Sequence, residues 1–170
     1  MGEGRIAILG PGGVGGLVAV VLWRAGAAVS CVARETTAHL ITERGLRLES
    51  AAFGDVVGWP RAVARRDDEP DLLFVATKAP ALEAALERVD PSRVHRTVII
   101  PLLNGIEHLA ILRRRYGRRV IAASIGGVEA MTRAPNHIVH TTPSAQIELA
   151  SDGDVAPDRL VEIADRLSRA

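Results

Sequence analysis

Residues 5–16 read RIAILGPGGVGG, an apolar run that enters a turn dense in glycine. Gly10, Gly12 and Gly15 fit the pattern G-x-G-x-x-G. Gly10 allows a tight turn off a strand, Gly12 lets a pyrophosphate approach the backbone, and Gly15 lets a helix pack close to the sheet. Backbone N–H groups and the dipole at the start of the helix also favour phosphate. Because a strand pattern precedes the motif and a helical pattern follows it, the stretch predicts a dinucleotide site.

The motif has a plainer interpretation as an ordinary glycine-rich turn between a strand and a helix. Its flanks favour dinucleotide binding, since apolar residues recur at helical spacing over residues 14–22 and Gly26 marks a helix end. We therefore expect the cofactor to contact five residues of the turn, namely Gly10, Gly12, Gly13, Val14 and Gly15.

The composition bounds the kind of protein. A chain of 170 residues suits one domain, or one domain and a fragment of a second. Hydrophobic residues make up 48% and aromatic residues 3%, so the core must be built from Val, Ile, Leu and Ala. A net charge of +1 argues against a dedicated nucleic-acid or membrane-surface protein.

Cysteine usage and the apolar runs indicate a compartment. The single cysteine, Cys31, can form no internal disulfide, which suits a reducing environment. The chain does not open with a signal-peptide pattern, and no apolar run reaches the roughly 18 residues of a membrane span. We expect a cytoplasmic protein with no membrane partner.

Strand and helix patterns alternate along the chain, which is typical of a parallel sheet with helices on both faces. The sequence predicts a Rossmann-type, doubly wound α/β fold, mostly parallel, with a short antiparallel C-terminal portion. We expect the dinucleotide-binding domain at residues 1–156, and at residues 157–170 the start of a helix with proline at its first position. Further strands are expected at residues 28–33, 46–50, 71–77, 97–100 and 120–124, small strands of a meander at 56–57 and 63, and helices from Thr36 or Thr37 to Arg44 and at residues 81–89 and 106–115.

Ligands on such sheets bind beyond the carboxyl ends of the strands, which draws attention to Arg34. An NAD site often has Asp or Glu at this place, whereas a guanidinium can bind a 2′-phosphate through two hydrogen bonds. Arg34 therefore favours NADP(H). Two alternatives stay open: Glu35 reads the ribose, or Arg34 is a solvated residue in a chain rich in arginine.

Lys78 and Asn104 follow two other expected strands. Lys78 is the only lysine in the chain, and at a strand's carboxyl end it can approach cofactor phosphate, although a lysine in water is the plainer alternative. The Asn104 amide offers a donor and an acceptor to a ribose or a substrate, although Asn-Gly is also a common turn pair.

Other polar residues fit structural roles. His137 and His140 lie three apart in an expected strand, so they face opposite sides, and no residues have metal-ligand spacing. Cys31 reads as a small buried hydrophobe. The arginines at 113–115 and 118–119 suit the C-terminal end of a helix, where cations complement the dipole, rather than a nucleic-acid site.

These positions together resemble those of the ketopantoate reductases (2-dehydropantoate 2-reductases). The resemblance covers nearly the whole chain, and the set of Arg, Lys and Asn-Gly at three strand ends is more specific than the glycines. One departure is Pro80-Ala81, near where family members often carry Gln. The matching stretches, in the family's order, are residues 5–16, 32–34 (VAR), 76–79 (ATKA), 103–105 (LNG) and 135–140 (PNHIVH).

The resemblance implies NADPH-dependent reduction of 2-ketopantoate, a small 2-oxo acid, to pantoate on the route to pantothenate and coenzyme A. It implies that Arg34 holds the 2′-phosphate, Lys78 contacts the phosphate-ribose end, and Asn104 lies near nicotinamide and substrate. The family also has a second, helical domain that carries the catalytic lysine and substrate-positioning groups.

No catalytic residue is therefore assigned in this chain, beyond Asn104 as a positioning group. We expect it to bind NADP(H) and to turn over ketopantoate poorly or not at all. Its expected protein partner is a second copy or the missing catalytic domain. The alternatives are a stand-alone NADP(H)-binding or redox-sensing module, and a related reductase of another 2-oxo acid.

Overall fold

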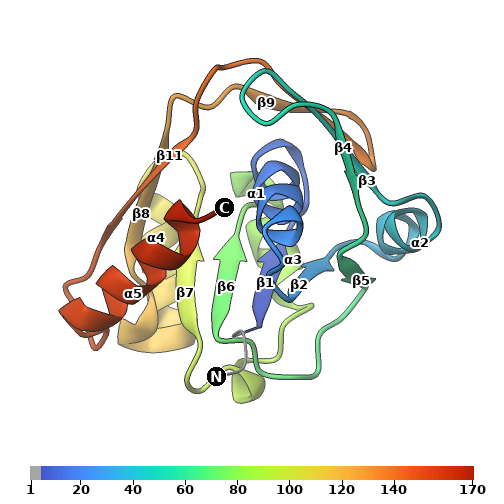
Figure 1. The fold of residues 1–170 in the computed structure, drawn as a ribbon. Helices are drawn as coiled ribbons and strands as arrows, with labels where there is room; N and C mark the ends of the chain where they lie inside the picture. The colour runs from blue at the N-terminus through green and yellow to red at the C-terminus, as the bar shows by residue number, and fades with distance from the viewer. Residues whose placement is uncertain (1–4) are drawn as a thin grey trace.

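A central parallel sheet organises the protein, as expected (Figure 1). A computed structural model describes residues 5–170. Within them, the sheet has five strands in the order β5-β2-β1-β6-β7, all paired in parallel. β1, β2, β6 and β7 are buried along their whole length, which is why they read as apolar runs, interrupted only by Ser30 in β2. The strands are β1 (Ile6–Leu9), β2 (Val29–Val32), β5 (Arg61–Val63), β6 (Leu72–Val75) and β7 (Val98–Pro101).

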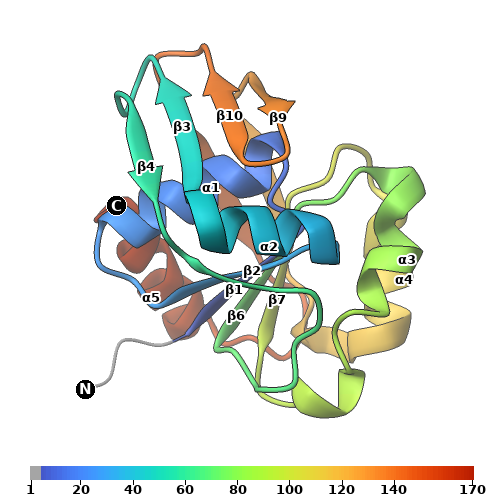
Figure 2. The ribbon, with the colours of Figure 1, turned by 90° about the vertical axis from the view of Figure 1, so that its right-hand side faces the viewer.

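Helices cover both faces of this sheet (Figure 2). α1 and α5 pack on one face in one apolar cluster, and α3 and α4 pack on the other face in a second cluster. The helices are α1 (Gly13–Arg24), α2 (Glu35–Arg44), α3 (Leu82–Leu86), α4 (Glu107–Tyr116) and α5 (Pro157–Ser168), with short 3-10 turns at Ala79–Ala81, Pro91–Arg93 and Gly117–Arg119.

A second, smaller sheet lies over α1, and it corrects the expected meander. Its order is β4-β3-β10-β9, and it joins β10 to β3 in parallel although these strands are far apart in the chain. β4 pairs antiparallel with β3 as a meander would, but β5 joins the central sheet beside β2 instead. The strands are β3 (Leu46–Ser50), β4 (Val56–Gly58), β9 (Ala130–Ala134) and β10 (His137–His140).

The expected strand at residues 120–124 is shifted. Val120 makes only an isolated parallel bridge to Ile99. The chain then leaves the central sheet, and β8 (Ala122–Gly126) pairs antiparallel with β11 (Gln146–Ala150). The C-terminal portion thus contains antiparallel pairs, as expected, in two separate places.

Some helix boundaries differ from the sequence prediction, and α4 is displaced by one residue at each end. α2 begins at Glu35, since Arg34 already takes the extended N-cap backbone at the end of β2 and its carbonyl accepts from Ala38 N at 2.8 Å. α3 is shorter than the predicted helix at residues 81–89. Its C-terminal end tightens into a 3-10 turn, in which Arg88 N donates to Ala85 O at 3.0 Å.

The expected structural roles of Cys31, His137 and His140 are confirmed. Cys31 is fully buried, and burial raises the pKa of its thiol to about 12. His140 is buried and bonds Ser50 at 2.8 Å, whereas His137 lies on the other face of β10 and pairs with Glu49 at 3.0 Å. Within residues 5–170, no group of three His, Cys, Asp or Glu side chains could hold a metal.

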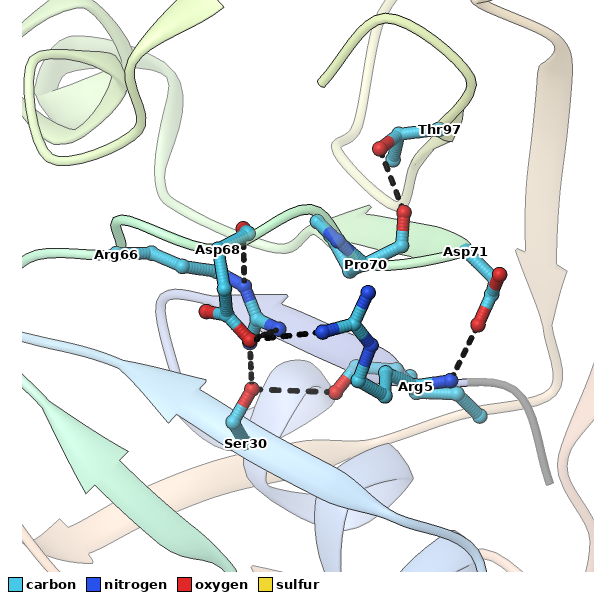
Figure 3. A network of polar contacts seen from close by, with 8 residues as sticks. Arg5, Ser30, Arg66, Asp68, Pro70, Asp71 and Thr97 are labelled. Carbon is cyan, nitrogen blue, oxygen red and sulfur yellow. Dashed lines mark hydrogen bonds and ion pairs between the residues drawn. The ribbon is translucent and has the colours of Figure 1, made fainter. Parts of the chain in front are cut away.

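The amino ends of the central strands are joined by a polar network that the sequence did not reveal (Figure 3). Arg66 is buried, with 4% exposure. Its guanidinium donates hydrogen bonds to Ser30 Oγ and to Asp68 Oδ2, the latter at 2.9 Å. Ser30 Oγ also donates to the Ile6 carbonyl at 3.3 Å. Burial lowers the pKa of Arg66, and the Asp68 carboxylate opposes this effect.

Replacement of Arg66 by Met is expected to lower the free energy of unfolding by about 2–4 kcal/mol, because it removes a buried cation from Asp68 and Ser30. Urea unfolding followed by circular dichroism measures this change. The neighbouring Arg65→Met is the matched control, since Arg65 is exposed, and it is expected to change stability by less than about 0.5 kcal/mol. Equal effects of the two variants would contradict a structural role for the network.

Candidate functional site

The three motif glycines hold the turn between β1 and α1 in different ways. Gly10 has φ +87°, a left-handed conformation, and a Cβ there would lie 2.8 Å from Thr77 Cγ2. A Cβ on Gly15 would overlap the carbonyl oxygen of Gly10 and lie 3.0 Å from Ala76 Cβ, so this glycine lets α1 close onto the turn and approach the end of β6. A Cβ on Gly12 would meet nothing closer than 3.8 Å. The turn is thus tightly packed at Gly10 and Gly15 and open at Gly12.

The start of α1 carries no carboxylate. Gly12 is its N-cap and makes no side-chain cap, and the first turn contains no acidic residue. Within residues 5–170, the other α-helices each have Asp or Glu in their first turn. In α4, Glu107 accepts from Ile106 N at 3.1 Å, and hydrogen bonds from its own and this backbone N–H lower the pKa of its carboxyl. The positive end of the α1 dipole is therefore left for an external anion.

The structure brings the other predicted site residues to the same edge. Arg34, Lys78 and Asn104 follow β2, β6 and β7, whose carboxyl ends lie side by side with that of β1 because these strands are parallel neighbours. All three residues are exposed. Their side chains make no hydrogen bond or ion pair with any other part of residues 5–170. Two cations and one amide thus face solvent around the glycine turn.

The structure also contains the features on which the alternative interpretations of Arg34 and Asn104 rest. Glu35 is the first residue of α2, next to Arg34, and is exposed as well. Gly105 has φ +86°, so the Asn104-Gly105 pair does make a local turn. Neither the neighbouring Glu35 nor the turn at Gly105 takes Arg34 or Asn104 away from the carboxyl ends of the strands.

Thr77 is a site residue that the sequence did not single out. Its Oγ1 is buried beside the glycine turn and has no hydrogen-bond partner within residues 5–170. A buried hydroxyl without a partner costs about 1–3 kcal/mol, and a polar ligand at the turn would offer it one. The orphaned hydroxyl, the open Gly12 and the free helix end together fit a dinucleotide.

A second missed feature is the contact between β9 and the turn. A Cβ on Gly13 would overlap the carbonyl oxygen of Ala130, and one on Gly16 would lie 2.6 Å from Ile138 Cγ1. Both glycines are additional to G-x-G-x-x-G, so they could have signalled another segment packed against α1. Figure 2 shows β9 and β10 beside the start of this helix.

The fold is that of a Rossmann-type, NAD(P)-binding domain. The chain matches the sequence profile of the family described as "Ketopantoate reductase PanE/ApbA" over residues 6–152. The chain belongs to this family.

Relatives agree with this assignment. "Uncharacterized oxidoreductase YkpB" of Bacillus subtilis (strain 168) is 28% identical over 141 residues, which are 82% of this chain and 46% of that protein. A D-mandelate dehydrogenase solved with NADH and anilino(oxo)acetate is 26% identical with a TM-score of 0.86, over 97% of this chain and 54% of that one. A PanE/ApbA family ketopantoate reductase from Ralstonia eutropha JMP134 is 26% identical with a TM-score of 0.78, over 97% and 53%.

The chain spans about half the length of these relatives. None of the helices within residues 5–170 is both long enough and apolar enough to cross a bilayer.

The glycine turn allows a matched pair of substitutions. Gly12→Ala is expected to leave the free energy of unfolding within about 0.5 kcal/mol, since the site has room for a methyl group, but to weaken NADPH binding at least about tenfold. Gly13→Ala is expected to destabilise the fold by about 1–3 kcal/mol, because its methyl group would displace β9. Urea unfolding and titration of NADPH fluorescence measure the two effects. Unchanged NADPH affinity in Gly12→Ala would refute the placement of pyrophosphate at this turn.

Proposed function

We propose that this chain is the cofactor-binding half of an NADPH-dependent reductase that converts 2-ketopantoate to pantoate in pantothenate and coenzyme A synthesis. The observation that carries the proposal is the gathering of Arg34, Lys78 and Asn104 at one edge of the sheet around the glycine turn. Membership of the ketopantoate reductase family supports it.

Each side chain has a role that follows from its chemistry. Gly10, Gly12, Gly13, Val14 and Gly15 would receive the pyrophosphate at the start of α1. Arg34 would hold the 2′-phosphate through a two-pronged, charge-assisted hydrogen bond, and Lys78 would neutralise charge at the phosphate-ribose end.

Asn104 would orient nicotinamide and substrate, because its amide both donates and accepts. When bound, NADPH would supply the hydride that reduces the ketone. The chain's own residues would fix the cofactor's position and charge environment.

We propose further that residues 1–156 form the cofactor domain and that residues 157–170 lead into a catalytic domain. The sequence contains one lysine, and it lies at the cofactor edge, so no other lysine here can protonate the ketone oxygen. The apolar face of α5 supports contact with a further domain or a second copy, since Leu160 and Leu167 are only half-buried and Val161 is 60% exposed. The cytoplasm is the compartment that suits this function.

A second candidate is reduction of another 2-oxo acid. The observation that favours it is the similarity to the D-mandelate dehydrogenase, which was solved with NADH and an oxoacetate. Because that relative was solved with NADH, NADH is the alternative cofactor whose affinity must be compared with that of NADPH.

Cofactor choice can be tested at Arg34. Arg34→Ala is expected to weaken NADPH binding about tenfold or more and to leave NADH binding unchanged, because only the 2′-phosphate loses a charged partner. Fluorescence titration with both cofactors measures this, and Arg44→Ala at the other end of α2 is the control, since Arg44 is also exposed. Equal affinity for both cofactors, unchanged in Arg34→Ala, would refute a role for Arg34 in NADP selection.

Turnover can be tested with NADPH oxidation against 2-ketopantoate, benzoylformate and pyruvate. We expect binding of NADPH with little or no turnover, and any residual rate to be highest with 2-ketopantoate. A kcat near the enzyme median of about 10 s⁻¹ from this chain alone would contradict the proposal that the catalytic acid lies elsewhere. A preference for benzoylformate would favour the second candidate.

A further inference from the structure

Strand β9 crosses directly over the glycine turn and brings the hydroxyl of Thr132 to it. Thr132 Oγ1 is the nearest atom to a Cβ placed on Gly12, at 3.8 Å. The strand is held there by backbone packing, because the Ala130 carbonyl lies where a side chain of Gly13 would be. The position of Thr132 is thus fixed by the start of α1 itself.

The register of the small sheet determines which way Thr132 points. Thr132 pairs with Ile138, and Ile138 pairs with Leu48. Ile138 and Leu48 are fully buried against α1, and residues paired across neighbouring strands share a face of the sheet. Thr132 therefore lies on the face turned toward the glycine turn.

The Thr132 hydroxyl is available for a ligand. Thr132 is exposed, and its hydroxyl makes no hydrogen bond with any other part of residues 5–170. The adjacent Arg133 is engaged elsewhere, since its guanidinium pairs with Glu49 at 2.9 Å on the other face of the sheet. The small sheet thus presents a neutral donor, not a cation, to the turn.

We infer that Thr132 is a cofactor-positioning residue whose hydroxyl donates a hydrogen bond to the pyrophosphate. The inference rests on the proposed binding of a nicotinamide dinucleotide at this turn. Gly12 is the motif glycine with open space, and a phosphate oxygen that uses this space comes within reach of the hydroxyl beside it. The motif alone supplies backbone donors from one turn, whereas Thr132 adds a side-chain donor from a separate sheet.

Two ligands that differ in the pyrophosphate test this role. 2′-Phospho-ADP-ribose contains the pyrophosphate, and 2′-AMP does not. Thr132→Val, which keeps the side-chain shape without the hydroxyl, is expected to weaken binding of 2′-phospho-ADP-ribose about five- to tenfold and to change 2′-AMP binding less than about twofold. Thr132→Ser, which keeps the hydroxyl, is expected to bind both ligands as the unsubstituted chain does. Isothermal titration calorimetry gives the affinities.

The pattern of results separates positioning from a structural effect. Loss of affinity for both ligands to the same degree in Thr132→Val, or for neither, would overturn the inference. A loss in Thr132→Ser equal to that in Thr132→Val would also overturn it, since the hydroxyl would then be irrelevant. If the unsubstituted chain binds neither ligand, the proposed function itself fails, whereas normal binding with an unaffected Thr132→Val removes only the role of Thr132.

Discussion

The close approach of α1 to its neighbours on two sides is the constraint on which the structure depends. At Gly15 the helix meets the end of β6, and at Gly13 and Gly16 it meets β9 and β10. A side chain at Gly13 or Gly16 would push β9 or β10 away from α1, and one at Gly15 would overlap the Gly10 carbonyl in the turn. The same backbone that lets the layers meet also leaves the helix N-terminus bare for phosphate, so packing and binding have one origin.

Stability and binding are placed at opposite edges of the central sheet. The amino ends of the strands are tied by the Arg66 network, in which a buried guanidinium bonds the Ser30 hydroxyl and one oxygen of the Asp68 carboxylate. At the carboxyl ends, Arg34, Lys78 and Asn104 have no partners within residues 5–170, and Thr77 keeps a buried hydroxyl unsatisfied. The two edges differ in their cations: Arg66 at the amino ends is paired, whereas Arg34 and Lys78 at the carboxyl ends have no partner within residues 5–170.

The sequence was informative wherever the signal is local. The glycine turn, the apolar strands and the helix ends at Gly26 and Arg44 depend on neighbouring residues, and the parallel sheet followed from their alternation. The pairing of β3 with β10 could not be foreseen, because it joins segments whose contact is set by the packing of α1. The placement of Thr77 and Thr132 at the turn depends on that tertiary arrangement, and nothing in their flanking sequence distinguishes them from other threonines. The roles of Arg34, Lys78 and Asn104 in binding remain predictions.

The burial of Cys31 gives the protein an internal reporter of its own opening. Its thiol is fully buried in β2, between β1 and the edge strand β5, and with a pKa raised to about 12 it is protonated at neutral pH. A thiol reagent can react only in molecules whose sheet has transiently separated, so the labelling rate counts those molecules. Since Cys31 is the single cysteine, no second thiol competes for the label. Any ligand that binds the closed form must slow this labelling, whatever reaction the ligand later undergoes.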